Sequence, residues 1–413
     1  MKLLLINPRD NDTSADPNLA RVINRFPHAF VLRHPPLHLA TLAALTPADI
    51  DVTIIDENSG TVDLGSVEAD LVGIGGMTQQ APRGHETADL FRKAGVPVVV
   101  GGIHATVMPK EAAGHADAVL VGEAERVWRG LISDFRRGRM KPVYRGALAD
   151  LSKSPVPRYD LVKNYHFANA AQRFVPVQIS RGCPHNCAFC SVTHVYGRRF
   201  RTKTVPQVLR ELRAIGEAFG PGVIVKFNDD NPFVNKAFAR RMLRAIAPMN
   251  LRWFALADIA IADDPALLEL MKKAGCLALG IGFESVEPGS LGEVSRWKME
   301  RLKNYPGAIK RIKEMGIAVA GSFMFGFDHD SAETFERVRD FVLEHRVPSK
   351  YSIVTPFPGT RLYEELSRQG RIRRDCSWSL YNFLNVVFDT RMPPEELCER
   401  LAWLYDETWP HFR

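Results

Sequence analysis

The sequence predicts an α/β protein in which a doubly wound parallel sheet is followed by a partial TIM-like (β/α)6 barrel. Short apolar runs alternate with amphipathic stretches along most of the chain, and this alternation stops near residue 137 and restarts near residue 173. The apolar runs of the first part are rich in β-branched residues, as expected for parallel strands buried on both faces. The aromatic-rich end of the chain predicts a short C-terminal cap over residues 371–413.

The first unit is expected to span residues 1–136. Its apolar runs predict strands at Leu3–Asn7, Val52–Asp56, Leu71–Gly75, Val96–Val100 and Ala118–Val121. Its amphipathic stretches predict helices at Leu37–Leu45, Arg83–Lys93, Lys110–Ala113 and Ala124–Arg136. Ligands of such sheets bind at the carboxyl ends of the strands, where this chain places glycines and polar residues.

A linker is expected over residues 137–172, which are basic and then rich in proline and serine, and a barrel over residues 173–370. The predicted barrel strands are Val175–Ser180, Val223–Phe227, Arg252–Ala255, Leu277–Gly282, Ala318–Phe325 and Lys350–Val354. The predicted barrel helices are Val205–Phe219, Lys236–Ala247, Pro265–Lys273, Gly307–Met315, Ala332–Glu344 and Thr360–Gln369. An active site is expected at the carboxyl ends of these strands.

The composition indicates a globular protein, with 46% hydrophobic and 24% charged residues among 413. No apolar run reaches the roughly 18 residues of a membrane span, and the apolar start MKLLLIN is too short for a signal peptide. We therefore expect a cytoplasmic protein without a membrane partner. The six cysteines do not form a disulfide framework, because three of them fall within eight positions.

The central motif is SRGCPHNCAFCSV, directly after the first barrel strand. Its spacing C-x-x-x-C-x-x-C, formed by Cys183, Cys187 and Cys190, can ligate three irons of a cubane cluster and leave the fourth iron open. The alternative is a structural zinc site with His185 or His194 as the fourth ligand, although no second ligand pair is evident. The remaining cysteines are isolated and are expected to be small buried hydrophobes: Cys276, Cys376 and Cys398.

With Phe189 before its last cysteine, this motif resembles the radical S-adenosylmethionine (SAM) superfamily. The barrel segments VYGRRFR, FNDDNPF, GIGFES and TPFPGT are similar to the same superfamily. The segments PPLHLATLAAL, GGIHATVMPKEA and VLVGEAE resemble the Rossmann-like, cobalamin-binding domain of one of its classes. The tail segment LYNFLNVVF is similar to the branch that holds the anaerobic bacteriochlorophyll cyclase and hopanoid-modifying enzymes.

The resemblance implies a 4Fe–4S cluster on Cys183, Cys187 and Cys190, whose open iron binds SAM. Reductive cleavage of SAM would then give a 5′-deoxyadenosyl radical that abstracts a substrate hydrogen. The resemblance further implies SAM contacts from Phe189, Asp229, Asp230, Glu284, Gly321, Phe325 and Lys298, with Arg296 as an alternative to Lys298. Acidic residues at strand ends can also cap the following helix, and Arg296 and Lys298 also fit a solvated surface.

The same resemblance places cobalamin at Thr78, Gly101, Gly102 and His104. The lower-ligand motif D-x-H-x-x-G is missing, so we expect cobalt without a protein histidine below it. The alternative is a sheet that only supports the barrel. His38 stands where the family more often has glycine, which puts a close approach of the cofactor there in question.

The leading hypothesis for function is cobalamin-dependent C-methylation of a small-molecule biosynthetic intermediate, with an electron donor such as flavodoxin or ferredoxin. The alternative is radical chemistry without methyl transfer: cyclisation, rearrangement, dehydration or dehydrogenation. The net charge of +7 is carried by the residues after 150, and this basic second half raises a third possibility, an RNA methylthiotransferase. That class carries further cluster cysteines, whereas none precedes Cys183 here, so no nucleic-acid partner is expected. A non-catalytic cobalamin sensor would not need the intact cysteine motif.

Overall fold

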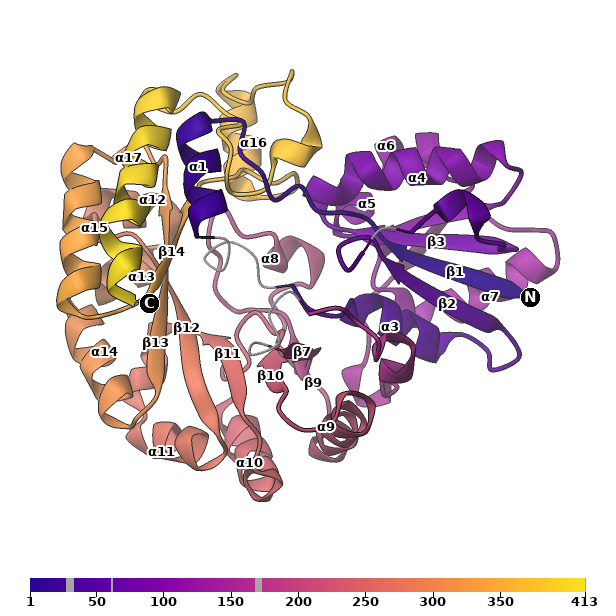
Figure 1. Ribbon diagram of the computed structural model, residues 1–413, viewed down its shortest axis with the longest axis horizontal. Helices are drawn as coiled ribbons and strands as arrows, with labels where there is room; N and C mark the ends of the chain where they lie inside the picture. Colours follow the sequence, from indigo (N-terminus) through magenta and orange to yellow (C-terminus); the bar gives the residue numbers. More distant parts are fainter. Residues whose placement is uncertain (27–32, 61, 168–172, 413) are drawn as a thin grey trace.

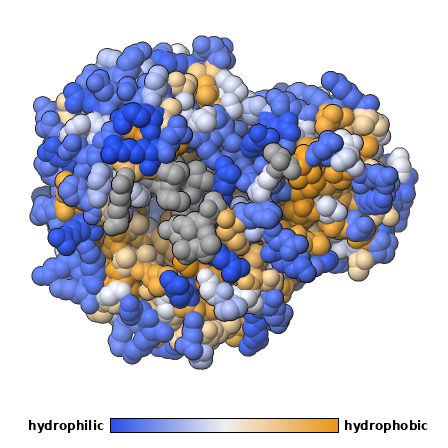
Figure 2. All heavy atoms as spheres, viewed as in Figure 1, coloured by the Kyte–Doolittle hydropathy of each residue, from blue (hydrophilic) through white to orange (hydrophobic). Residues whose placement is uncertain are grey.

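A computed structural model of the chain describes residues 1–26, 33–60, 62–167 and 173–412. These residues form two lobes, each built around a parallel sheet with helices on its faces (Figure 1). Figure 2 shows the same two lobes from the same side, with hydrophilic residues along much of the rim and hydrophobic residues gathered on part of the right lobe. The predicted α/β fold class is therefore confirmed. The last residues of the expected linker, 168–172, lie outside the described residues.

The first sheet has six strands among the described residues, in the order β2-β1-β3-β4-β5-β6, and neighbouring strands are parallel throughout. These strands are β1 Lys2–Asn7, β2 Asp51–Asp56, β3 Leu71–Gly76, β4 Val98–Gly102, β5 Ala118–Gly122 and β6 Val143–Gly146. The first five match the predicted strands closely. The edge strand β6 lies in the stretch that was expected to be a linker. The sequence analysis missed this strand because no apolar run marks it, and only Tyr144 of its side chains is buried.

Helices cover both faces of this sheet because successive strand residues point to opposite sides. One face packs against α3 Leu37–Leu45 and α7 Trp128–Arg136. The other face packs against α4 Ala81–Lys93, α5 Ile103–Val107 and α6 Pro109–His115. Thus Leu3 and Leu5 of β1 lie in one apolar core, whereas Leu4 and Ile6 lie in the other.

The second sheet also has six parallel strands among the described residues, in the order β14-β13-β12-β11-β10-β7, and forms the predicted partial barrel. Its strands are β7 Phe174–Val177, β10 Ile224–Phe227, β11 Trp253–Ala257, β12 Cys276–Glu284, β13 Ala318–Phe325 and β14 Ser349–Ile353. The short strands β8 Ser180–Arg181 and β9 Arg201–Thr202 pair with each other in antiparallel fashion.

The helices of the barrel follow the predicted ones. They are α9 Val205–Phe219, α10 Lys236–Ile246, α11 Pro265–Lys273, α14 Tyr305–Glu314, α15 Ala332–Glu344 and α16 Arg361–Arg368. Three short helices were not predicted: α8 Val192–Val195, α12 Pro288–Val294 and α13 Arg296–Arg301. They occupy the connections that lead away from the carboxyl ends of the strands.

The two ends of the chain join the lobes. The helix α1 Pro17–Arg25 follows β1 of the first lobe but packs against α17 Pro394–Thr408, which itself packs against the barrel helix α15 (Figure 1). Arg21 and Arg25 form ion pairs with Asp406 at 2.6 and 2.7 Å. The aromatic-rich tail thus caps the barrel, as expected, although neither α1 nor α17 was predicted as a helix.

The tail also contacts the loop after β1. The side-chain amides of Asn382 and Asn385 donate to the backbone carbonyl of Thr13 at 2.9 and 3.1 Å. The cap segment therefore bridges the lobes beside the carboxyl edge of the first sheet. No helix in the described part of the chain has both the length and the apolar character needed to cross a membrane.

Candidate functional site

The three clustered cysteines lie in the loop that follows β7 and β8, at the carboxyl edge of the barrel sheet. Cys183, Cys187 and Cys190 are free thiols of intermediate exposure. Burial is the main cause that raises the pKa of Cys183 to about 11 and that of Cys190 to about 12, and the charges of neighbouring thiols contribute to both increases. The three thiols therefore lie close enough to influence one another.

This donor set fits the cluster that the spacing predicts. Three thiols in one loop can ligate three irons of a cubane, and iron would replace the protons that burial retains on the sulfurs. His185, a candidate for the fourth ligand of a zinc site, is engaged elsewhere. Its Nε2 lies 3.0 Å from Oδ2 of Asp258, and its ring packs against Trp297 with 4.3 Å between centroids.

Asp229 fixes the backbone that leads into the cysteine loop. It follows β10, and its side chain accepts hydrogen bonds from the Ile179 amide at 3.0 Å, from the Ser180 amide and from the Ser180 hydroxyl at 2.7 Å. These donors lower the pKa of Asp229, but burial outweighs them and raises it to about 7. Only 2% of Asp229 is exposed, so its oxygens face the loop backbone rather than open space.

The charge of the neighbouring carboxyl group acts on the cysteines. Asp230 is less buried than Asp229 as a residue, and its charge raises the pKa of both Cys183 and Cys190. Burial raises the pKa of Asp230 to about 6. Of the two acidic residues that were predicted together, Asp230 is therefore the one whose charge acts on the cysteine thiols.

Glu284 and Lys298 form a buried ion pair near Cys187. Glu284 ends β12 with a φ of +67°, and Lys298 comes from α13. The Lys298 ammonium donates to Glu284 Oε1 at 2.8 Å and to the Gly282 carbonyl at 2.6 Å. Burial lowers the pKa of Lys298, but the charges of Glu284 and Cys187 outweigh this effect and raise it. The sequence predicted both residues as candidates but not that they pair.

The predicted aromatic and glycine positions divide into two groups. Phe189 and Cys187 pack against a small apolar cluster that includes Val294. In contrast, Phe325 is 1% exposed and stacks on Phe335 at 4.2 Å, within the core between strands and helices. Gly321 lies in the middle of β13, where a side chain would collide with the Ser349 hydroxyl. Phe189, which belongs to the cysteine loop, therefore lies at the site. Gly321 and Phe325 instead lie in the packed barrel wall.

A mostly apolar cavity lies at the carboxyl edge of the first sheet and extends to the barrel. Its volume is about 160 Å³, and it opens to solvent. Glycines form its floor: Gly73, Gly75, Gly101, Gly102 and Gly122. Helices α3 and α7 contribute walls, and Arg181, Val195 and Tyr196 contribute a side from the barrel lobe. Arg181 precedes Cys183 by two positions, so the cavity adjoins the cysteine loop.

A glycine floor fits a broad, flat cofactor such as cobalamin, because exposed backbone allows close approach. Gly102 has a φ of +95°, and a Cβ there would come within 2.6 Å of the Gly76 carbonyl oxygen, so the position requires glycine. Arg181 also ties the lobes together beside this floor, through ion pairs to Glu123 at 3.2 Å and Glu125 at 2.6 Å. The residues present therefore fit cobalamin at this place.

Not every position predicted for cobalamin lines the cavity. Gly101 and Gly102 do, whereas Thr78 and His104 are buried outside its lining, with exposures of 2% and 3%. His38 lines the cavity, and its Nε2 lies 3.3 Å from the Gly75 carbonyl oxygen. Burial lowers the pKa of His38, so the imidazole is neutral near neutral pH.

Two lysines inside the barrel were missed by the sequence analysis. Val225 and Phe227 of β10 point into the apolar core between sheet and helices, so by alternation Lys226 points to the inner face of the barrel. Tyr351 of β14 lies in the same core, so its neighbour Lys350 also points to the inner face. Burial first, and then the charge of Lys350, lower the pKa of Lys226 to about 8. In the part of the chain that the structure describes, no ion pair joins Lys226 or Lys350 to a carboxylate, although the charge of Asp12 acts on Lys350 and raises its pKa. The sequence signal that could have identified Lys226 is a single lysine within a short apolar strand.

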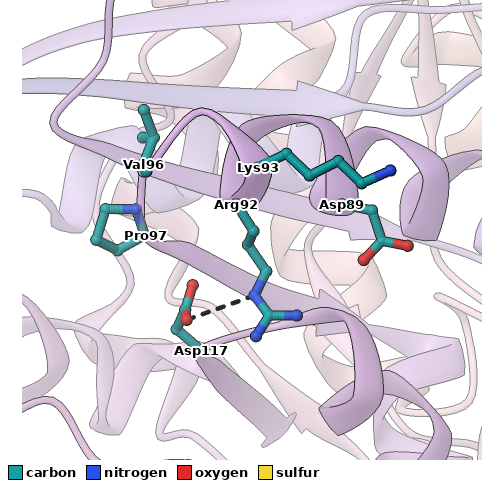
Figure 3. A pocket seen from close by; sticks show the side chains of 7 residues that line it. Asp89, Arg92, Lys93, Val96, Pro97 and Asp117 are labelled. Atoms are coloured by element: carbon teal, nitrogen blue, oxygen red, sulfur yellow. Dashed lines mark ion pairs between the residues drawn. The ribbon is translucent and has the colours of Figure 1, made fainter.

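A second hollow lies at the opposite edge of the first sheet (Figure 3). Val96 and Pro97 precede β4, and Asp117 precedes β5, so this hollow adjoins the amino ends of the strands. An ion pair of 3.4 Å between Arg92 and Asp117 spans it. Its position away from the carboxyl edges separates it from the cysteines and the glycine floor.

Comparisons with known families match both lobes. Residues 177–342 match the model of the radical SAM superfamily, and residues 28–132 match that of the B12 binding domain. The first range contains the cysteine loop, and the second contains Gly75, Gly101 and Gly102 of the cavity floor.

Relatives of known name match over most of the chain. It is 32% identical to the bacteriochlorophyllide d C-12(1)-methyltransferase of Chlorobaculum tepidum, over 91% of this chain and 82% of that protein. It is 27% identical to the hopanoid C-2 methylase of Rhodopseudomonas palustris, over 87% and 70%. It is also 23% identical to the anaerobic magnesium-protoporphyrin IX monomethyl ester cyclase of Rubrivivax gelatinosus, over 90% and 73%.

The fold is similar to that of OxsB, described as a cobalamin-dependent S-adenosylmethionine radical enzyme with aqua-cobalamin and S-adenosylmethionine bound. The TM-score is 0.72 at 15% identity, covering 94% of this chain and 64% of that chain. At this identity the likeness supports the two-lobed fold and its arrangement of sheets.

Proposed function

We propose that this chain, which belongs to the radical SAM superfamily and carries its B12-binding domain, is an enzyme that methylates carbon in a small-molecule biosynthetic intermediate. The methyl-transferring names of the relatives support the reaction. The observation that carries the proposal is the position of the glycine-floored cavity directly beside the cysteine loop. That adjacency would let two cofactors act on one substrate.

Cys183, Cys187 and Cys190 would hold the 4Fe–4S cluster, and the glycine floor that includes Gly101 and Gly102 would hold cobalamin. When bound, the cluster and SAM supply a 5′-deoxyadenosyl radical, and methylcobalamin supplies the methyl group. We propose that Thr78 and His104 act on cobalamin binding only indirectly, because both are buried outside the cavity lining.

The SAM-binding residues are proposed from their place at the cysteine loop. Phe189 would pack against the adenine, and Asp230 would accept a hydrogen bond from the amino group. Lys298 and Glu284, now paired with each other, carry the charges complementary to the SAM carboxylate and ammonium groups. Asp229 would act through the loop backbone that it holds, and Gly321 and Phe325 would shape the barrel wall behind the site.

The substrate is proposed to carry a carboxylate or another anionic group. Lys226 and Lys350 lie on the inner face of the barrel without an ion pair to a carboxylate among the described residues, and Asp12 is the acidic residue whose charge acts on Lys350. A charge that is partly removed from water is costly unless it is paired. An anionic substituent of the substrate would supply that partner. The reductant is proposed to be a flavodoxin or ferredoxin, since the cluster must receive an electron from outside the chain.

We further propose that the cobalamin-binding unit extends to at least Gly146, because β6 pairs with β5. The expected linker would then begin after that strand, followed by the barrel and the cap near the expected positions 173–370 and 371–413.

The experiment is an anaerobic reconstitution with iron, sulfide and hydroxocobalamin, followed by metal counts and by incubation with SAM, a reductant and chlorin or hopanoid candidates. Methylation predicts about four irons, stoichiometric cobalt, and both 5′-deoxyadenosine and S-adenosylhomocysteine as products. Cys183→Ala should remove iron and both products, whereas Cys376→Ala, a cysteine outside the motif, should retain them.

The resemblance to the cyclase supports a second candidate, a radical reaction without methyl transfer. This candidate predicts 5′-deoxyadenosine without S-adenosylhomocysteine on the productive substrate. Zinc in place of iron after reconstitution would contradict both candidates.

A further inference from the structure

Three side chains behind the first sheet form a cluster that the proposed reaction does not use. His85 comes from α4, His104 from α5 and Glu111 from α6. One ligand atom of each lies within 4.8 Å of the other two. The Glu111 Oε1 atom is 3.6 Å from His104 Nε2 and 3.9 Å from His85 Nδ1.

His104 is the unusual member of this cluster. It is only 3% exposed, and neither of its ring nitrogens has a hydrogen-bond partner among the described residues. Buried polar atoms are nearly always satisfied in native proteins, and an ion is one of the groups that satisfies them. The Nε2 atom points toward Glu111 at a distance too long for a hydrogen bond but suited to a shared ligand.

The charge of the cluster also calls for a cation. Glu111 accepts the Trp378 indole N–H on both oxygens at 2.9 Å. In the part of the chain that the structure describes, the basic groups within ion-pair distance of Glu111 are the two imidazoles. Since no lysine or arginine neutralises this carboxylate there, a divalent ion bound by neutral imidazoles would do so.

We propose that His85, His104 and Glu111 bind one divalent transition-metal ion of the zinc class. Zinc is held at about 2.0–2.2 Å by histidine and carboxylate ligands, and its tetrahedral geometry separates ligand atoms by about 3.4 Å. The distances of 3.6 and 3.9 Å would need only small side-chain shifts to reach that arrangement. Magnesium and calcium prefer oxygen ligands and suit this set poorly.

This metal site is separate from the cofactors of the proposed reaction. Helices α4, α5 and α6 cover one face of the first sheet, whereas α3 and α7 wall the cavity from the other face. Helix α5 also reaches the cavity through Ile103 and Thr106, but none of the three proposed ligands lines it. The ion would join these three helices to the cap, because the indole N–H of Trp378 in the cap donates to Glu111. His104 follows Gly102 by two positions, so the ion would also steady the cavity floor.

The cluster offers a matched control residue. The His115 ring stacks on that of His85, with centroids 4.2 Å apart and planes 7° apart. Its Nδ1 lies 2.9 Å from Oδ2 of Asp89, so its hydrogen bonding is directed away from the cluster. His115 is therefore a neighbouring histidine outside the proposed ligand set.

The test is the zinc content of the full chain with its iron–sulfur cluster in place. Wild type, His104→Gln, Glu111→Gln and His115→Gln are purified anaerobically, incubated with zinc sulfate, desalted and analysed for zinc and iron. We expect about one zinc per chain in wild type and in His115→Gln, and at least a tenfold lower content in the other two. Equal iron in all four proteins shows that zinc has not entered the cysteine loop.

A second measurement separates metal loss from misfolding. Zinc should raise the melting temperature of wild type and of His115→Gln but leave that of Glu111→Gln, a nearly isosteric change, unaltered. Trp378→Phe should weaken zinc affinity about 10- to 100-fold by freeing the carboxylate that it orients. Zinc content in wild type no higher than in His104→Gln, or retention of zinc by Glu111→Gln, overturns the proposal.

Discussion

The Lys298 ammonium lies 2.8 Å from Glu284 Oε1, and this ion pair is almost wholly enclosed, with side-chain exposures of 11% and 10%. The partners come from different elements, α13 and the end of β12, at a strand end that also carries a positive φ. The pair thus fixes the backbone on the side of the barrel mouth near Cys187, whose pKa is raised by burial and lowered by Lys298.

Lys298→Met is expected to lower the free energy of unfolding by about 3–5 kcal/mol, because it leaves the Glu284 carboxylate buried without its partner. Urea denaturation followed by circular dichroism measures the change. Arg296→Ala, two positions earlier on the same helix, is the control, since its side chain is 86% exposed. It should change stability by less than about 0.5 kcal/mol. Equal effects of the two substitutions would contradict a structural role for the pair.

Asp229→Ala and Asp230→Ala are expected to behave differently although the residues are adjacent. Removing the Asp229 carboxylate leaves the buried amides of Ile179 and Ser180 unsatisfied, at roughly 1–3 kcal/mol for each. The loop before Cys183 should then loosen, and the iron content after reconstitution should fall.

Asp230→Ala should keep both stability and iron, because its carboxyl group, unlike that of Asp229, accepts no hydrogen bond from the amides of Ile179 and Ser180. Its expected defect is weaker binding of SAM, measured by equilibrium dialysis with labelled SAM. Iron loss in Asp230→Ala with full iron in Asp229→Ala would reverse these assignments.

Helices with local end signals could be predicted from the sequence to the residue. The helix α9 has a capping box between Thr204 and Gln207, and α11 begins with Asp264 as its N-cap followed by proline. Their signals lie within a few residues of each other, so no tertiary information is needed. Buried parallel strands were recognised for the same reason, since most of them are short runs dominated by apolar residues.

Features that depend on distant contacts could not be predicted in this way. Strand β6 exists because it pairs with β5, and α1 because it packs on α17. The cysteine motif identified the cluster loop because its ligands are close in sequence. In contrast, the pairing of Glu284 with Lys298 and the meeting of His85 with Glu111 arise only when separate elements pack together.

Binding of an anionic substrate is expected to weaken as the pH rises through about 8, the value to which burial and Lys350 lower the pKa of Lys226. Below that pH the ammonium is charged and attracts the anion, and above it the charge is lost. The apparent KM of the productive substrate, measured across this range, should therefore increase with pH. A carboxylate ester of the same substrate, which lacks the charge, should bind with little pH dependence.

Lys226→Met should raise the KM at neutral pH and flatten its pH profile. The same change is expected to raise the melting temperature below about pH 8, because a lysine whose pKa is lowered by folding destabilises the protein while it is charged. A stabilised variant with an unchanged KM would show that the lysine is buried but does not meet the substrate.

Gly101→Leu is expected to separate cobalamin binding from cluster assembly. A Cβ at Gly101 would make an ordinary contact of 3.5 Å with Leu120, so the backbone can accept a side chain there. The longer leucine side chain would occupy the cavity floor and exclude a flat cofactor. Cobalt per chain should fall at least tenfold while iron stays at the wild-type content.

Gly130→Leu, on the exposed side of α7 with open space around it, is the control and should retain both metals. Full cobalt in Gly101→Leu would place the cofactor elsewhere, because a corrin and a leucine cannot share the same floor.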